Sequence, residues 1–316
     1  MPKIELSLVV PMYNESECID EFFSSVIPVL DRVSSSHEIV CVNDGSSDDT
    51  LARLLAVQKR VPEVVVIDLA RNFGKEAALS AGLDHARGAA VVPIDADLQD
   101  PPALIEEFVR LWHEGYEVVY AQRRARKGES LFKLKSAEMF YRAINKMSDV
   151  RIPPNTGDYR LMDRRVVDAL QRLPERTRFM KGMFAWVGHR QIAVEFDRNP
   201  RHQGTTKWNY AGLWRLAIDG ITSFSSRPLK IWTYIGVGVA ALALLYALFL
   251  MTRVLVSGID VPGYASLIVV VLMLGGMQLM GIGILGEYIG RIFEEVKQRP
   301  VYLVRECFRV DGEDDE

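Results

Sequence analysis

Residues 90–102 read Ala-Val-Val-Pro-Ile-Asp-Ala-Asp-Leu-Gln-Asp-Pro-Pro, a short apolar run followed by closely spaced carboxylates. The run at residues 90–94 is β-branched and bounded by turn-forming residues, which predicts a buried strand. Asp95 and Asp97 follow it and are separated by one residue, so both can aim at a single point where the strand gives way to a turn. The two closing prolines stop the strand and favour a following helix.

Similar apolar runs recur on both sides of this strand, and segments with helical periodicity separate them at residues 17–30, 48–58 and 75–86. This alternation predicts an α/β fold with a mostly parallel sheet flanked by helices. Ser46 or Ser47 is expected to cap the second of these helices. The expected strands are residues 6–10, 38–42, 64–69, 90–94 and 117–121.

The bulk composition excludes several classes of protein. A chain of 316 residues with 49% hydrophobic content can bury a core, and a net charge of −3 gives no reason to expect nucleic acid as a partner. The three cysteines lack C-x-x-C spacing, so neither a disulfide framework nor a zinc site is indicated and a reducing compartment fits best. The first residues lack the features of a signal peptide, so we expect the N-terminal domain to stay in the cytoplasm.

Residues 231–252 and 265–286 carry no charged side chain, and each stretch is long enough to cross a hydrocarbon core of ~30 Å. We interpret them as a transmembrane hairpin; the alternative is a pair of buried core helices. Basic residues flank the outer ends of the hairpin, which predicts that the large N-terminal domain and the C-terminus lie in the cytoplasm. These flanking residues are Arg227, Lys230, Arg291, Lys297 and Arg299.

Two further segments, residues 131–147 and 208–224, mix aromatic and aliphatic side chains with basic ones. They fit interfacial helices at the membrane surface about as well as ordinary amphipathic surface helices. The expected division is a globular domain at 1–207, a juxtamembrane helix at 208–230, the hairpin at 231–286 and a C-terminal segment at 287–316.

The paired acids suggest a cation site. Open α/β sheets bind ligands at the carboxyl ends of their strands, although a solvated acidic turn is the simpler interpretation of Asp95 and Asp97 alone. Carboxylate oxygens suit magnesium or manganese, with waters and phosphates completing the shell, and Gln99 continues the alternation and offers an amide oxygen. A G-x-G-x-x-G loop is missing after the first strand, which counts against a dehydrogenase, and no Walker A sequence occurs.

Four motifs stand in order along the chain: Pro11-Met12-Tyr13-Asn14-Glu15, Asn43-Asp44-Gly45-Ser46-Ser47-Asp48, Asp95-Ala96-Asp97-Leu98-Gln99-Asp100-Pro101-Pro102 and Gly157-Asp158-Tyr159-Arg160-Leu161. Together they resemble the inverting family 2 glycosyltransferases of GT-A fold. More narrowly, with the terminal hairpin, they look like the polyisoprenyl-phosphate glycosyltransferases, a group that includes bactoprenol glucosyltransferases, dolichol-phosphate mannose synthase and the undecaprenyl-phosphate aminoarabinose transferase.

The resemblance implies roles for individual residues. It places the metal, magnesium or manganese, on Asp95, Asp97 and Gln99. Asp158 lies where such enzymes carry the acidic residue beside the acceptor. Its role could be that of a general base, of an orienting group, or merely of a turn cap. The residues implied to contact the nucleotide sugar are Pro11, Tyr13, Glu15, Asp44, Lys75, Asp95, Ala96 and Asp97, with helix solvation as the alternative for Lys75.

A basic element at residues 198–207 is similar to the R-x-x-G-x-S-K sequence of the family, with Thr206 in place of the usual serine. The resemblance implies that Arg198, Arg201 and Lys207 bind the acceptor phosphate. It makes Arg201 and Lys207 part of the catalytic group, together with Asp97 and Asp158. Arginine suits phosphate as a bidentate donor and lysine as a point charge.

The implied activity is metal-dependent, inverting transfer of one sugar from a nucleotide sugar to a polyprenyl phosphate at the cytoplasmic face of a bacterial inner membrane. A UDP-sugar of glucose type is favoured as the donor, and the resemblance favours a homo-oligomer, specifically a tetramer. One alternative is a processive polysaccharide synthase, which normally carries a Q-x-x-R-W element that is not found here. Another is a membrane scaffold that binds nucleotide sugar or lipid without turnover.

Overall fold

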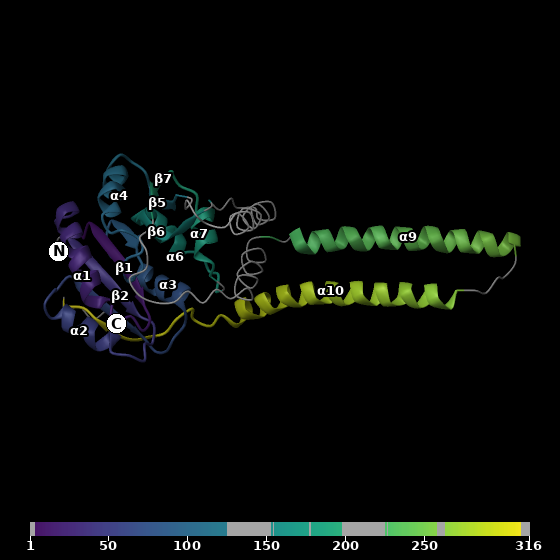
Figure 1. Cartoon of the computed structure of the whole chain (residues 1–316), viewed down its shortest axis with the longest axis horizontal. Helices are drawn as coiled ribbons and strands as arrows, with labels where there is room; N and C mark the ends of the chain where they lie inside the picture. Colours follow the sequence, from purple (N-terminus) through teal and green to yellow (C-terminus); the bar gives the residue numbers. More distant parts are fainter. Residues whose placement is uncertain are drawn as a thin grey trace.

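The computed structural model describes residues 4–124, 153, 155–176, 178–197, 225, 227–257 and 263–310. An α/β domain lies at one end of the molecule, and two long antiparallel helices extend from it (Figure 1). The predicted segments at 131–147 and 208–224, the basic element at 198–207 and the tail at 311–316 lie outside the described residues.

An eight-stranded mixed sheet forms the centre of the domain, with strand order β7-β5-β6-β4-β1-β2-β3-β8. The neighbours β4, β1, β2 and β3 are parallel, whereas β6 runs antiparallel to β4 and β5, and β8 antiparallel to β3. The strands are β1 (Leu6–Met12), β2 (His37–Asn43), β3 (Val64–Leu69), β4 (Ala90–Pro93), β5 (Val118–Arg123), β6 (Thr156–Asp163), β7 (Gln191–Phe196) and β8 (Val304–Phe308).

Helices cover both faces of this sheet and bury its apolar side chains in two layers. Successive residues of β1 face opposite layers: Leu8 and Val10 pack in one, Val9 in the other, and all three are fully buried. The first layer contains α1 (Ile19–Val33), α2 (Thr50–Gln58) and α4 (Leu104–His113), and the second α3 (Lys75–His85), α6 (Arg164–Gln171) and α7 (Met180–Trp186). The predicted mostly parallel, helix-flanked sheet is confirmed.

The expected capping of α2 by a serine is wrong. The helix begins at Thr50, its N-cap position is Asp49, and the Thr50 backbone N–H donates to the carboxylate of Asp48 at 3.1 Å. The two serines are used elsewhere, because both bond to Asn14 in the loop after β1: Ser46 Oγ accepts from its backbone N–H, and Ser47 donates its backbone N–H to the side-chain oxygen. The serines thereby join two loops.

The two long helices are α9 (Arg227–Ser257) and α10 (Tyr264–Lys297). Within them Arg227–Phe249 and Val269–Lys297 have mean hydropathies of 1.9 and 2.1 and are 0% buried, so by length and composition each can cross a membrane. Their exposure contradicts the alternative of buried core helices. Gly281 lets the helices approach, since a Cβ there would lie 2.0 Å from the indole nitrogen of Trp232.

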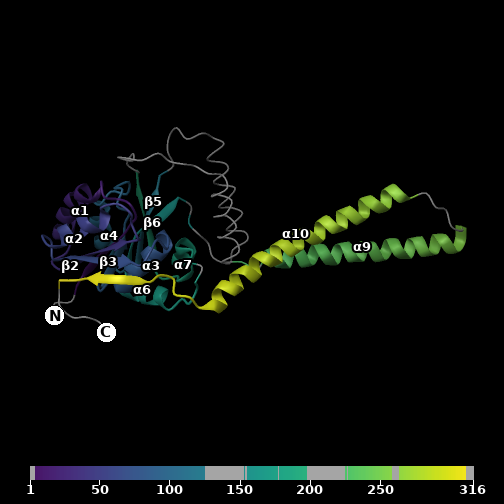
Figure 2. The same ribbon diagram turned by 90° about the horizontal axis from the view of Figure 1, so that it is seen from below.

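The C-terminal segment predicted at 287–316 begins inside α10. Residues 287–297 continue α10, and β8 then adds to the edge of the sheet beside β3 (Figure 2). The chain therefore leaves the α/β domain, runs through the hairpin and returns to the same sheet.

Candidate active site at the carboxyl edge of the sheet

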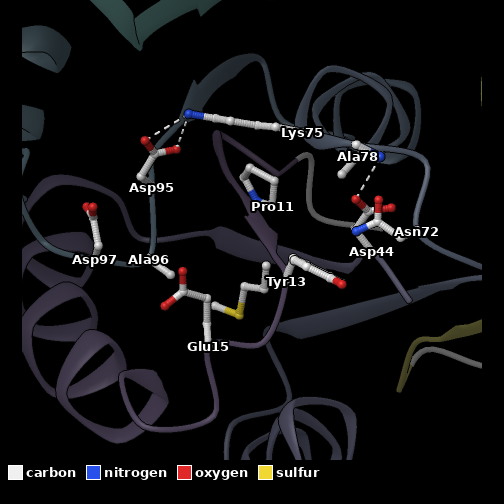
Figure 3. A pocket seen from close by; sticks show the side chains of 12 residues that line it. Pro11, Tyr13, Glu15, Asp44, Asn72, Lys75, Ala78, Asp95, Ala96 and Asp97 are labelled. Carbon is white, nitrogen blue, oxygen red and sulfur yellow. Dashed lines mark hydrogen bonds and ion pairs between the residues drawn. The ribbon is translucent and has the colours of Figure 1, made fainter. Parts of the chain in front are cut away.

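The carboxyl ends of β1, β2 and β4 surround a cavity of about 460 Å³. Figure 3 shows Asp95 and Asp97 at one side of this cavity, Asp44 and Asn72 at the other, and Pro11 between them. The lining residues are Pro11, Met12, Tyr13, Glu15, Asp44, Asn72, Gly74, Lys75, Ala78, Asp95, Ala96 and Asp97. Every residue that the sequence assigned to the nucleotide sugar is among them.

Asp97 is held by the turn that follows it. Gln99 is 3% exposed and donates its side-chain amide to Asp97 Oδ2 at 2.7 Å, while its backbone N–H lies 3.2 Å from Asp97 Oδ1. Leu98 has a φ of 52°, a conformation uncommon for a residue with a Cβ, and this folds the chain back on itself. The expected strand alternation through Gln99 is therefore wrong, and its role as a metal ligand stays a prediction.

Lys75, the first residue of α3, joins the two acidic elements of the site. Its Nζ lies 2.7 Å from Asp95 Oδ1 and 3.0 Å from Asp158 Oδ2. Burial alone would lower the pKa of Lys75, but the two carboxylates raise it above its ordinary value, so the ammonium stays charged. The sequence predicted that Lys75 contacts the nucleotide sugar. Its ion pairs in addition connect the end of β4 to β6.

Asp158 comes from β6 and is more enclosed than Asp95, with a side chain that is 16% exposed against 35%. Burial would raise the pKa of Asp158, yet the charges of Lys75 and Lys181 outweigh it and hold the pKa below its ordinary value. Oδ1 of Asp158 is buried and has no hydrogen-bond partner within the described ranges. Because orphaned buried oxygens are rare, this atom indicates a place for a bound group.

The residues after Asp158 fix its backbone. The Tyr159 hydroxyl donates to the carbonyl of Pro101 at 2.9 Å, which connects β6 to the loop after β4. Arg160 is buried, lies over the ring of Phe184 at 3.9 Å and donates to the carbonyl of Gly157 at 2.8 Å. Burial lowers the pKa of Arg160 to about 10, which still leaves it charged at neutral pH.

The opposite end of the cavity is built from two loops that touch. Asp44 is 2% exposed, and its carboxylate accepts the backbone N–H groups of Phe73 at 2.7 Å and Gly74 at 2.9 Å. Gly45 has a φ of 62°, and a Cβ there would lie 2.4 Å from the backbone of Arg71. Only glycine permits this approach. Both oxygens of Asp44 thus accept hydrogen bonds from the loop before α3, and the contact of Asp44 with a nucleoside stays a prediction.

The acidic side chains of the cavity fit a metal ion that is bound partly by the protein and partly by the substrate. No group of three or more His, Cys, Asp and Glu side chains is placed to hold a metal in the part of the chain that the structure describes. Two carboxylates, Asp95 and Asp97, line the cavity together. Magnesium is commonly held by one or two carboxylates with waters and substrate phosphates, so this oxygen set fits a metal bound together with a diphosphate.

Sequence reasoning missed several residues of the cavity, namely Met12, Asn72, Gly74 and Ala78. The segment at residues 71–75 directly before a helix was the available signal for Asn72 and Gly74, because backbone N–H groups at helix starts favour anions. Arg198, Arg201 and Lys207 lie outside the described residues, so their roles stay predictions.

Replacing Glu76 by glutamine should flatten the pH dependence of stability between pH 4.5 and 7. Burial, followed by the charge of Asp158, raises the pKa of Glu76 from 4.5 to about 7. Between these values the folded protein binds more protons here than the unfolded chain, so the free energy of unfolding decreases as pH rises. Glutamine cannot titrate, yet its oxygen can still accept the Met180 N–H, which lies 3.2 Å from Glu76 Oε2. Thermal unfolding across this range compares the two proteins, and an equal decline in both would contradict the assignment.

The chain is similar in sequence to known glycosyltransferases over nearly its whole length. A model of glycosyl transferase family 2 matches residues 7–171, and a model of the GtrB C-terminal hairpin matches residues 227–292. An uncharacterized glycosyltransferase of Synechocystis sp. is 56% identical over 308 residues, which cover 98% of this chain and 97% of that relative. The SfII prophage-derived bactoprenol glucosyl transferase of Shigella flexneri is 48% identical over 306 residues, which cover 97% of this chain and 99% of that relative. A prophage bactoprenol glucosyl transferase homolog of Escherichia coli is 47% identical over 302 residues, which cover 96% of this chain and 99% of that relative.

Proposed function

Because this chain belongs to glycosyl transferase family 2, and is therefore a glycosyltransferase, we propose that it transfers one sugar from a UDP-sugar to a polyprenyl phosphate. A glucose-type donor is favoured, since relatives that align over nearly the whole chain bear the name bactoprenol glucosyl transferase. The observation that carries the proposal is the cavity itself: the residues expected to contact the donor come from separate motifs and converge on it.

The donor would lie along the cavity, with the nucleoside toward Tyr13 and Asp44 and the diphosphate toward Asp95 and Asp97. Tyr13 is 49% exposed and offers a ring face to the base. Asp95 and Asp97 would hold magnesium or manganese, with Gln99 fixing Asp97. When bound, such an ion neutralises the charge that develops on the departing nucleoside diphosphate.

The acceptor would enter beside Asp158. A phosphate oxygen of the lipid attacks the anomeric carbon, the bond from that carbon to the donor phosphate breaks, and the nucleoside diphosphate leaves with inversion. A phosphate monoester, whose second pKa is near ~6, is largely a dianion at neutral pH, so no proton need be removed from it. The lowered pKa of Asp158 also makes it a weak base. We therefore assign Asp158 to orientation, through Lys75, and Arg198, Arg201 and Lys207 to the acceptor phosphate.

The hairpin supports a membrane location for this reaction. Because β8 pairs with β3 after the chain has passed through α9 and α10, both ends of the hairpin must lie on one side of a membrane that it crosses. We place the catalytic domain and both termini on the cytoplasmic side of a bacterial inner membrane, in agreement with the basic residues at the hairpin ends. We propose further that the chain forms a homo-oligomer, specifically a tetramer.

The direct test is to incubate the detergent-purified full chain with undecaprenyl phosphate, Mg²⁺ or Mn²⁺, and a panel of labelled UDP-sugars. The expected product is a lipid with one added sugar, identified by mass spectrometry. Products with many sugars would instead support a processive synthase. Nucleotide binding without any lipid product, across the whole panel, would indicate a scaffold and overturn the proposal.

A further inference from the structure

Two arginines near the C-terminus, Arg305 in β8 and Arg309 just after it, pair with buried carboxylates of β3 and β2. Arg305 lies 2.9 Å from Asp68 Oδ2, and Arg309 lies 3.1 Å from Glu38 Oε2. The side chains of Asp68 and Glu38 are 3% and 4% exposed. Both pairs hold β8 against the domain, but only the first lies at the carboxyl edge, where the cavity is.

Arg305 is connected to the cavity loops by a continuous set of hydrogen bonds. The other oxygen of Asp68 accepts the side-chain amide of Asn43 at 2.7 Å. The Asn43 side-chain oxygen in turn accepts the backbone N–H of Ser46 at 3.3 Å. Ser46 then accepts the backbone N–H of Asn14 at 3.0 Å, in the loop after β1. This path therefore ends in the loops that carry Tyr13 and Asp44 into the cavity.

A second contact of Arg305 acts on the third loop of the cavity. Its Nη2 donates to the carbonyl of Ala70 at 2.7 Å, and the backbone N–H of Ala70 donates to the carbonyl of Leu303 at 2.8 Å. The chain continues from Ala70 directly to Asn72 and Gly74, which line the cavity. The guanidinium thus contacts the start of this loop directly, and it reaches the other two loops through Asp68 and Asn43; its planar fork donates to Asp68 and to Ala70 at the same time.

Arg309 makes a comparable set of contacts without reaching the cavity. It donates to Glu38 and to the carbonyl of His85 at 3.0 Å, at the opposite end of α3 from Lys75. Glu38 also accepts the Ser7 hydroxyl at 2.6 Å, near the start of β1. The Arg309 side chain is 13% exposed against 56% for Arg305, so its loss should disturb the fold at least as much.

We propose that Arg305 is a positioning residue for nucleotide binding: from the strand that follows the membrane hairpin, it fixes the loops that form the nucleoside end of the cavity. It touches no substrate and acts through Asp68 and Asn43 and through Ala70. Because only residues 298–303 separate the end of α10 at Lys297 from β8, the same strand joins the hairpin to the donor site. The inference rests on the proposed function, which makes this cavity the nucleotide site.

The test measures UDP binding to the full-length protein in detergent with Mn²⁺, by isothermal titration calorimetry, for wild type, Arg305→Gln and Arg309→Gln. Thermal unfolding of each protein is recorded in parallel. Arg305→Gln should weaken UDP binding about tenfold, an effect within the range that changes in a coupled network produce. Arg309→Gln should bind UDP as wild type does, although it lowers the unfolding temperature at least as far. If either glutamine variant fails to fold, Arg305→Lys and Arg309→Lys make the same comparison.

The outcomes separate the two proposals. Wild-type protein that binds no UDP would overturn the proposed function itself. Normal binding by wild type with equal affinities in the two variants, whether both unchanged or both weakened, would overturn the role of Arg305. A loss confined to the Arg305 variant supports it, because a purely stabilising role of β8 predicts that the Arg309 variant suffers as well.

Discussion

Asp97→Ala should reduce sugar transfer at least about 100- to 1,000-fold, the scale on which enzymes lose activity when one preorganised group for transition-state charge is removed. Asp97 lines the cavity beside Asp95, and Gln99 holds its carboxylate at 2.7 Å. Without it, the proposed metal would keep a single carboxylate, and the charge on the leaving diphosphate would be poorly neutralised. Initial rates with labelled UDP-sugar and undecaprenyl phosphate, at matched metal and lipid, measure the effect.

The matched control is Asp49→Ala. Asp49 also precedes a helix near the same edge of the sheet, but it is exposed, makes no side-chain cap bond and does not line the cavity. We expect this variant to keep wild-type rates. A second measurement is the affinity for the metal in the presence of UDP. We expect this affinity to fall in Asp97→Ala and to stay unchanged in Asp49→Ala. Wild-type transfer by Asp97→Ala would refute the assignment of Asp97 to the metal.

Asp158→Asn should lower kcat by about 100-fold or more while leaving the affinity for UDP within a few-fold of wild type. The substitution keeps the shape of the side chain but removes the charge that faces Lys75 at 3.0 Å. Lys75 would then pair with Asp95 alone, and the acceptor phosphate would lose its oriented neighbour. A fall in kcat without weaker donor binding is the pattern expected when an interaction acts mainly in the transition state.

Asp168→Asn serves as the control for this variant, because Asp168 is a half-exposed residue of α6 whose ion pair with Arg164 spans 3.9 Å. The dependence of rate on pH then separates two roles. If Asp158 orients the acceptor, the residual activity of Asp158→Asn follows the same pH profile as wild type at a lower level. A profile that loses its acidic limb in the variant would instead identify Asp158 as the general base.

Local patterns in the sequence were sufficient for five of the eight strands, β1 to β5, and for the two long apolar helices. The run at β3 was predicted with its observed bounds, Val64–Leu69, because a short β-branched strand is marked by its own residues and by the turns around it. The apolar stretches that became α9 and α10 were equally clear, since length and lack of charge decide them. The strands β6, β7 and β8 were missed; β8, for example, is a five-residue strand with Arg305 and Glu306 in it and shows no apolar pattern until β3 supplies its partner.

The residues of the candidate site were identified in the sequence because parallel strands bring their carboxyl ends to one edge, so motifs far apart in the chain had to meet. What each side chain does there depended on neighbours that no local pattern contains. The sequence indicated Asp95 and Asp97, but only the tertiary structure placed Lys75 between Asp95 and Asp158, turned Gln99 back onto Asp97 and committed both oxygens of Asp44 to the loop at residues 73–74. Hydrogen bonds and ion pairs act over about 3 Å, and the packing of distant elements sets those distances.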